Sequence, residues 1–502
     1  MNNLTALLRS QASVKIAKQR TVLEDRHGSL SLGTLLERCT ELSVLLKAQQ
    51  CQFVALYADN SSAWVSVDLA CQQASICLVP IPTFFSQKQI AHVFNTVAID
   101  LVICDSAIDF ITASGLDLDA RGATVFGQLQ LLFIERPETG LSLPQGTEKI
   151  TFTSGSTGQP KGVCLSAEQQ FIQASALADT VALEKPRHLC LLPLSTLLEN
   201  IAGVYAPLIA GGQVIIPSLA EVGFQGSSNI DPQLFCATIG RYQPNSIIVT
   251  PQLLVLMVAA VAQGWTAPTS LKFVAVGGGR VSAQLMVQAH KCNIPAYEGY
   301  GLSECASVVS LNTSTNSRVN SSGKTLAHLQ VKILDGEIIV TGNAMLGYAG
   351  QPDSWHQQHI YTGDLGSLNS AGYLTVTGRK KNLLISSFGR NINPEWVESQ
   401  LLANIALADV VVFGDERPYC VALVYPRDPR LTDSEIQFFI DSVNHSLPDY
   451  ARILRWQRLP GALSSKPGLL TDNGRPVRSA ITAAHKALLN ALYDTNLQVS
   501  QT

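Results

Sequence analysis

A loop rich in glycine and hydroxyl side chains is chemically the most informative stretch of the chain. It spans residues 150–163 with the sequence ITFTSGSTGQPKGV. Glycines let backbone N–H groups approach phosphate oxygens, hydroxyls add donors, and a lysine supplies positive charge. The loop is not of the Walker type, because Lys161 follows Pro160 and no serine or threonine comes after it. We predict a phosphate-binding loop in which Lys161 is a catalytic cation. Its nucleotide-binding residues are Thr153, Ser154, Gly155, Ser156, Thr157 and Gly158.

Further candidate strings follow in order along the chain. They read VGGGR at 276–280, EGYGLSEC at 298–305, YTGDLG at 361–366 and GRKK at 378–381. The glycine cluster follows a β-strand pattern, where a flat base can slide against backbone. An aromatic ring, a short hydroxyl and a carboxylate supply purine stacking, a phosphate donor and a hard ligand for a hard cation.

Together these strings resemble, in order and over nearly the whole chain, the motifs of the adenylate-forming superfamily. Acyl-CoA synthetases, nonribosomal adenylation domains and firefly-type luciferases belong to it. The resemblance implies that the chain binds ATP and Mg²⁺ and converts a carboxylic acid to an acyl-adenylate. It also implies site roles: Gly278, Gly279, Tyr300 and Gly301 at the adenine, Ser303 at the α-phosphate, Glu304 as catalytic residue and magnesium ligand, Asp364 at the ribose hydroxyls, and Arg379 at the ribose or phosphate.

The resemblance continues into the last quarter of the chain. It implies that Lys381 is the hinge of a mobile C-terminal domain and that Gly389 lines the thiol tunnel. The segment GLLTDNGRPVR at 468–478 resembles the loop that carries the family's catalytic lysine, but here that position holds Arg475. Arginine keeps the positive charge with a bulkier, planar shape. Either Arg475 performs the lysine's task, or nearby Lys466 replaces it, or adenylate formation is impaired.

The acid-binding pocket is expected near residues 191–203, LLPLSTLLENIAG, with Thr196, Leu197 and Glu199 as pocket residues. Amino-acid-activating relatives carry an aspartate here for the substrate's ammonium group. Glu199 is the only acidic residue between Arg187 and Pro217, so an apolar acid fits better than an amino acid. These strings are most similar to long-chain fatty acyl-CoA synthetases. The alternative is that the leucines simply belong to the core.

The expected reaction is therefore ATP-dependent activation of a fatty acid and transfer of the acyl group to a thiol, with CoA as the first choice. One alternative is a ligase that loads the phosphopantetheine of a separate acyl carrier protein, since no carrier domain is attached. Another is a luciferase-like use of the adenylate. A further alternative, from a different class, is a regulator that binds ATP but is catalytically silent. The arginine at position 475, where the family has lysine, supports this alternative.

The elements that position these residues indicate an α/β protein. From about residue 32 to 375, short strand patterns such as Phe53–Tyr57 and Phe273–Val276 alternate with helical patterns such as Ala167–Ala182. This alternation predicts mostly parallel sheets. Short, turn-separated strands around 331–341 and 373–376 predict a small antiparallel barrel or sheet. We expect an N-terminal adenylation domain at 1–379 and a small α+β C-terminal domain at 380–502.

Composition limits the function classes further. The chain is 46% hydrophobic, and its 35 basic residues nearly balance its 38 acidic ones. The even balance excludes an electrostatic footprint for nucleic acid. We expect no transmembrane segment and no signal peptide. The eleven cysteines occur singly, so we expect reduced thiols, no zinc site and a cytoplasmic protein.

Overall fold

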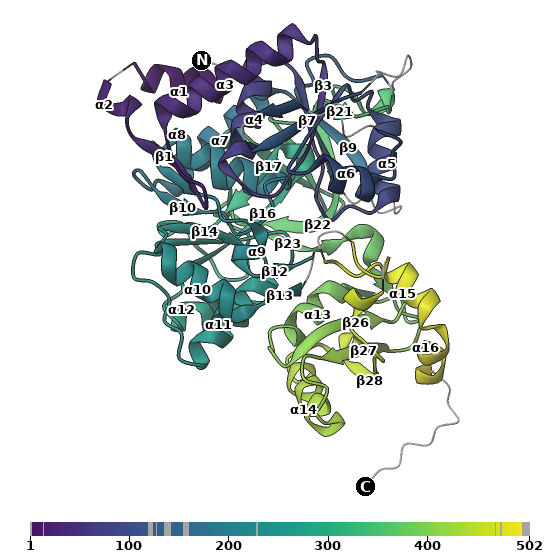
Figure 1. The fold of residues 1–502 in the computed structure, drawn as a ribbon. Helices are drawn as coiled ribbons and strands as arrows, with labels where there is room; N and C mark the ends of the chain where they lie inside the picture. Colours follow the sequence, from purple (N-terminus) through teal and green to yellow (C-terminus); the bar gives the residue numbers. More distant parts are fainter. Residues whose placement is uncertain are drawn as a thin grey trace.

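The computed structural model describes residues 3–13, 15–118, 124–126, 128–134, 142–153, 160–226, 229–466, 468–471 and 474–493. Figure 1 shows a large N-terminal body and, below it, a smaller C-terminal body coloured green to yellow. The smaller body has hydrophobic clusters of its own, whose buried members all come from residues after 383. The expected division into a large α/β part and a separate α+β part is confirmed.

An eight-stranded sheet carries the phosphate-loop segment. Its central strands pair in parallel, and β5 is buried at every position, as expected when helices cover both faces of a sheet. The strand order is β21 (Gly347–Tyr348), β9 (Lys161–Leu165), β8 (Lys149–Thr153), β4 (Cys77–Pro80), β3 (Phe53–Tyr57), β5 (Leu101–Cys104), β7 (Leu129–Phe133) and β6 (Thr124–Phe126).

A nine-stranded sheet carries the glycine cluster and the tyrosine motif. Its middle strands are parallel, and antiparallel strands close its two ends. The strand order is β18 (Lys324–Thr325), β17 (Ser307–Leu311), β16 (Ala296–Leu302), β15 (Phe273–Val276), β14 (Ser246–Val249), β10 (Arg187–Leu189), β11 (Gln213–Ile215), β1 (Thr21–Asp25) and β2 (Gly28–Ser31).

Hydroxyl caps set where many of the helices begin. Ser61 accepts from the N–H of Trp64 at the start of α4, and Thr250 caps α11, whose first residue is Pro251. Such caps satisfy N–H groups that the first helical turn leaves free. The helices of the larger body are α1 (Leu4–Gln11), α2 (Lys15–Lys18), α3 (Leu32–Ala48), α4 (Ser62–Ala74), α5 (Gln87–Thr96), α6 (Ala107–Ser114), α7 (Ala167–Val181), α8 (Ala206–Ile209), α9 (Leu219–Val222), α10 (Pro232–Tyr242), α11 (Pro251–Ala262) and α12 (Ala283–Lys291).

Of the expected barrel or sheet, the described residues form the sheet, and the small barrel is not formed. The segment forms an open antiparallel sheet in the order β19 (Gln330–Leu334), β20 (Glu337–Thr341), β22 (His359–Leu368) and β23 (Leu374–Arg379). A two-residue turn at Asp335–Gly336, with positive φ at both positions, joins β19 to β20. Closure would need the outer strands to pair, and in the described residues β23 instead continues toward the C-terminal body.

The C-terminal body is built on a three-stranded sheet in the order β26-β27-β28, flanked by a short hairpin and helices. Its elements are β24 (Leu384–Ile385), β25 (Asn391–Ile392), α13 (Pro394–Leu401), β26 (Leu407–Phe413), β27 (Cys420–Pro426), α14 (Asp433–Asn444), β28 (Ile453–Arg458), α15 (Arg478–Ala484) and α16 (Lys486–Tyr493). Across the described ranges, the structure contains no helix with the length and apolar character that a bilayer crossing requires.

All eleven cysteines are unbridged. Ten of them are buried, and Cys292 is half-buried. Burial raises the pKa of Cys51 to about 11 and that of Cys104 to about 12. The interior therefore holds these thiols in the protonated form at neutral pH.

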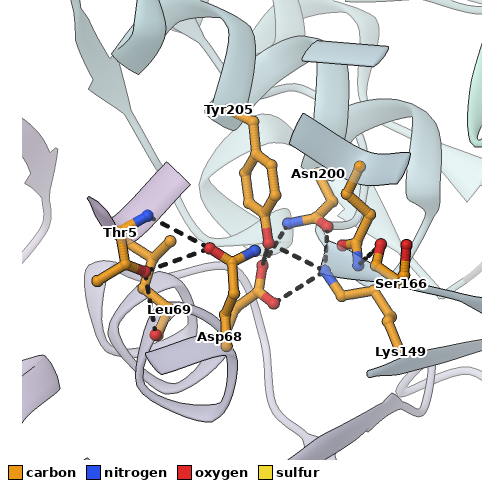
Figure 2. Close-up of polar contacts among 9 residues, drawn as sticks. Thr5, Asp68, Leu69, Lys149, Ser166, Asn200 and Tyr205 are labelled. Atoms are coloured by element: carbon orange, nitrogen blue, oxygen red, sulfur yellow. Dashed lines mark hydrogen bonds and ion pairs between the residues drawn. The ribbon is translucent and has the colours of Figure 1, made fainter. Parts of the chain in front are cut away.

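A buried polar network joins the larger body's segments, and Figure 2 shows it. Lys149 Nζ lies 2.8 Å from Asp68 Oδ1, and their side chains are 3% and 2% exposed. The ammonium also donates to Asn200 Oδ1 at 2.6 Å, and the Tyr205 hydroxyl donates to Asp68 Oδ2 at 2.9 Å. Asp68 lies on α4, Lys149 opens β8, and the other two belong to the π-helix Glu199–Tyr205. The network thus ties the strand before the phosphate loop to a helix beside the expected acid pocket.

We predict that Lys149→Met lowers the free energy of unfolding by about 3–5 kcal/mol, because it leaves the Asp68 carboxylate buried without a counter-charge. Urea denaturation measures the change. The matched control is Lys18→Met, since Lys18 forms an exposed pair with Glu37 at 3.2 Å. That control should stay within about 1 kcal/mol of the wild type. Equal losses in the two variants would contradict a special role for the buried pair.

Candidate active site

Asp364 is the centre of a three-residue cluster. On β22 it faces Arg379 of β23 across the antiparallel pair, and Arg379 Nε lies 2.7 Å from Asp364 Oδ1. The Tyr300 hydroxyl, from β16, donates to Asp364 Oδ2 at 2.7 Å. Burial raises the pKa of Asp364, and the charge of Arg379 opposes that rise. A carboxylate accepts about four hydrogen bonds, so two vicinal hydroxyls fit beside these two partners.

The tyrosine strand needs glycine at one of its positions. A Cβ on Gly301 would lie 1.8 Å from the carbonyl oxygen of Ser307 on the neighbouring strand β17. Gly301 therefore allows β16 and β17 to pair closely next to Tyr300. Ser303 and Glu304 follow at once in a 3₁₀ turn, Ser303–Cys305.

Arg475 brings the C-terminal body to this cluster. Its Nε and Nη2 donate to the carbonyl oxygen of Gly278 at 3.2 and 2.7 Å. Gly278, followed by Gly279, lies in the loop after β15 with a φ of +79°. Lys466 lies elsewhere in the C-terminal body, near His485. Burial of His485 lowers the pKa of that histidine, and the charge of Lys466 lowers it further. The structure thus brings Arg475 to the glycine cluster.

Glu304 and Lys161 meet through a tyrosine that the sequence analysis did not single out. The Tyr348 hydroxyl donates to Glu304 Oε1 at 2.8 Å, and Lys161 Nζ lies 4.7 Å from the centre of the Tyr348 ring. Tyr348 belongs to β21, which pairs with β9. Its sequence neighbourhood carries no chemical pattern, so only this long-range pairing reveals it.

The phosphate loop is described only at its ends. Thr153 and Lys161 face each other as partners in the antiparallel pair of β8 and β9. The expected contacts Ser154, Gly155, Ser156, Thr157 and Gly158 lie outside the described residues. Of the described ends, Lys161 lies beside Tyr348, whose hydroxyl donates to Glu304.

The hinge segment follows directly on β23. Arg280 donates to the carbonyl oxygens of Val376 at 3.2 Å and Thr377 at 2.5 Å, which ties this strand to the glycine cluster. A Cβ on Gly378 would lie 1.3 Å from Asn393 Nδ2, so the α13 N-cap packs directly on the backbone there. Lys381 follows in an exposed turn. Gly389 lies in the exposed turn between β24 and β25.

The expected acid-pocket residues differ in their surroundings. Leu197 is buried, and the Thr196 hydroxyl donates locally to Pro193 O at 2.6 Å. Glu199 is fully buried, and burial raises its pKa. A Cβ on Gly277 would lie 3.6 Å from Leu198 Cδ2, so an apolar side chain reaches the glycine cluster from this segment.

Glu199 also belongs to a buried group of metal-ligand types. His188, Cys190 and Glu199 bring ligand atoms within 4.8 Å of one another. The His188 ring already bonds Glu199 Oε1 at 3.0 Å and the Ser246 hydroxyl at 2.9 Å. Glu199 Oε2 accepts from the N–H of Leu192 at 3.3 Å. These hydrogen bonds give the buried polar atoms partners without an ion.

We predict a pH-dependent stability from Glu298, which precedes the tyrosine motif. Burial raises its pKa to about 7, although the charge of Arg280 opposes the rise. Between about pH 4.5 and 7 the folded state then binds more protons than the unfolded state, so the free energy of unfolding falls as pH rises. Glu298→Gln should remove this slope, so the stability difference between variant and wild type should change by about 2 kcal/mol from pH 5 to pH 8.

Urea unfolding at the two pH values measures this change. The exposed Glu37→Gln variant is the control, and its difference from the wild type should not change across the window. A wild-type slope that persists in Glu298→Gln would show that another group titrates.

Comparison with known proteins identifies the family of the chain. Residues 10–348 match the family AMP-binding enzyme, and residues 381–497 match the AMP-binding enzyme C-terminal domain. A 2-succinylbenzoate–CoA ligase of Bacillus velezensis is 30% identical over 60% of this chain and 61% of its own length. One of Bacillus cereus is 24% identical over 91% and 94%. A long-chain-fatty-acid–CoA ligase of Mycobacterium bovis is 23% identical over 78% and 74%.

Solved structures share the fold over its full extent. An anthranilate CoA ligase in complex with anthranoyl-AMP superposes with a TM-score of 0.80 at 17% identity, covering 97% of this chain and 98% of that one. An o-succinylbenzoate CoA synthetase of Bacillus subtilis in complex with ATP and magnesium gives 0.73 at 21% identity, covering 94% and 98%. On its matched regions and its fold, the chain belongs to the AMP-binding enzyme family.

Proposed function

We propose that the protein is an ATP-dependent acid–thiol ligase that converts a fatty acid to an acyl-adenylate and transfers the acyl group to CoA. The observation that carries the proposal is the convergence on one place of Tyr300, Asp364 and Arg379 with Arg475 from the other body. These groups supply a stacking ring, an acceptor for ribose hydroxyls and two positive charges. Groups of these kinds are what the binding of a nucleotide beside a carboxylate substrate requires.

In the first step a carboxylate oxygen of the acid attacks the α-phosphorus of ATP. The bond from that phosphorus to the bridging oxygen breaks, and pyrophosphate leaves. Arg475 and Lys161 would stabilise the negative charge that develops on the transferring group. Asp364 and Tyr300 would hold the nucleoside so that the α-phosphorus faces the acid.

The residues present fit a magnesium ion. Glu304 offers a carboxylate whose Oε1 accepts a single described hydrogen bond, from Tyr348, and carboxylate oxygens are the ligands this ion prefers. When bound, magnesium supplies neutralising charge at the phosphates. Glu304 would hold it, and Ser303 would contribute its hydroxyl to the α-phosphate.

In the second step the CoA sulfur attacks the acyl carbonyl carbon. The anhydride bond to AMP breaks, and the thiol proton passes to solvent. The C-terminal domain, from residue 380 onward, would rotate at Lys381 between the steps and bring Gly389 to the thiol path. The exposed positions of both residues leave room for that movement.

The acid is the least constrained part of the proposal, because relatives named for different acids match the chain. The second candidate is 2-succinylbenzoate, the acid in the names of several relatives. That acid carries an additional carboxylate, which a buried pocket would have to pair with a cation. Residues 188–216 contain no lysine or arginine, so the segment favours an acid with an apolar tail.

We predict that ATP–pyrophosphate exchange depends on fatty acids. Each methylene buried in the pocket contributes about 0.8 kcal/mol, so kcat/KM should rise about fourfold per added CH₂ until the pocket is full. The panel includes 2-succinylbenzoate, aryl acids and α-amino acids as matched alternatives. If one of those is the best substrate, the apolar pocket is misassigned. If no acid supports exchange, the chain is the silent regulator.

Mass spectrometry of the product identifies the acceptor in the same reactions. CoA and a phosphopantetheinylated acyl carrier protein are supplied separately. An acyl-CoA product supports the proposal, whereas acylation of the carrier alone would replace CoA with that protein.

We predict that Arg475→Ala lowers acyl-adenylate formation by about 100- to 1000-fold. The substitution removes a positive charge that would stabilise the negative charge on the transferring group. Thioester formation from supplied acyl-adenylate should be largely spared, since the loop carrying Arg475 moves away for that step. Lys466→Ala is the control and should retain adenylate formation. If Lys466→Ala fails while Arg475→Ala is active, the catalytic cation is Lys466.

A further inference from the structure

Tyr348 touches two groups of opposite charge that both serve the phosphates in the proposed function. Its hydroxyl donates to Glu304 Oε1 at 2.8 Å, and the Lys161 ammonium lies 4.7 Å from its ring centre. Among the described ion pairs, none joins Lys161 directly to Glu304. One aromatic side chain therefore contacts both groups and stands in place of a direct pair.

The backbone of Tyr348 is fixed from several sides. It pairs with Val163 of β9, its N–H donates to the Ser354 hydroxyl at 2.8 Å, and its carbonyl accepts from Trp355 Nε1 at 2.9 Å. Just before it, the N–H of Met345 donates to the backbone carbonyl of Glu304 at 2.7 Å. The tyrosine is thus carried on a segment bonded both to the strand that begins at Lys161 and to the turn that holds Glu304.

The chemistry of the ring suits both contacts. A phenol donates one hydrogen bond and presents a π-face that attracts a cation. The geometry uses the phenol as the donor, since its hydroxyl points to Glu304 Oε1 at 2.8 Å. A hydrogen bond to one carboxylate oxygen orients the group, and the bond from Tyr348 is made to Oε1.

We propose that Tyr348 is a positioning residue that aims the Glu304 carboxylate and holds the Lys161 ammonium, so that the two charges remain available to magnesium and to phosphate. Without the ring, both flexible side chains could approach each other, and the direct pair would have to break before MgATP bound. The proposal rests on the proposed function, because it takes Glu304 as the metal ligand and Lys161 as a phosphate contact.

The two contacts can be separated by substitution. Tyr348→Phe removes the hydroxyl and keeps the ring, so only the aim of Glu304 is lost. Tyr348→Leu removes both contacts. The matched control is Tyr373→Phe, because Tyr373 also carries a lysine over its ring, Lys324 at 5.2 Å, and lies outside the site.

Calorimetric titration of the purified protein with ATP, in magnesium or in EDTA, tests this prediction. Tyr348→Phe should weaken MgATP binding about tenfold and leave metal-free ATP binding unchanged. Tyr348→Leu should weaken both, and Tyr373→Phe neither. Circular dichroism of each variant confirms that it is folded.

Other outcomes overturn one proposal or the other. A wild type that binds no ATP in magnesium would refute the proposed function itself. A wild type and control that bind MgATP normally, with Tyr348→Phe unchanged, would refute the positioning role alone. Equal weakening of Tyr348→Phe with and without magnesium would also refute it, since the hydroxyl would then act independently of the metal ligand.

Discussion

The buried pair of Lys149 and Asp68 is the constraint on which the site depends. Charges removed from water are tolerated only when their partners are fully arranged, and here an amide and a phenol complete the arrangement. Lys149 opens the strand that ends at Thr153, where the phosphate loop begins. Asn200 and Tyr205 belong to the π-helix Glu199–Tyr205, which overlaps the segment of the proposed acid pocket. One set of hydrogen bonds therefore joins the two segments that carry the proposed acid and phosphate sites.

The remaining parts of the site are assembled from separate sheets. Tyr300 comes from the nine-stranded sheet, Asp364 and Arg379 from the open four-stranded sheet, and Lys161 from the eight-stranded one. Arg475 comes from the C-terminal body. Arg280 bonds β23 to the glycine cluster just before the proposed hinge at Lys381. In the proposed mechanism, the C-terminal domain would therefore move about a point that follows a strand held to the proposed nucleotide site.

Sequence patterns predicted what depends on local order. Continuous apolar runs such as Leu101–Cys104 form strands, as expected. Asp364 lies in contact with Tyr300 and Arg379, which the sequence motifs also single out. The sequence did not distinguish a closed barrel from the open sheet, because closure is decided by pairing between distant strands. Tyr348 was missed for the same reason, since its contacts exist only once β21 pairs with β9. The buried position of the Glu199 side chain depends on its hydrogen bond to His188. No spacing of residues in the sequence indicates that contact.

The burial of the cysteines has a consequence for an enzyme of the proposed kind. Its mixed anhydride is an acylating agent, and any thiolate within reach competes with the intended acceptor. Here ten of the eleven thiols are shielded from solvent, including Cys305 directly after Glu304, and burial raises the pKa of Cys305 as well. In an enzyme of the proposed kind, this burial would protect the protein against acylation by its own intermediate. The mixed anhydride could then form without reacting with the cysteines of the same chain.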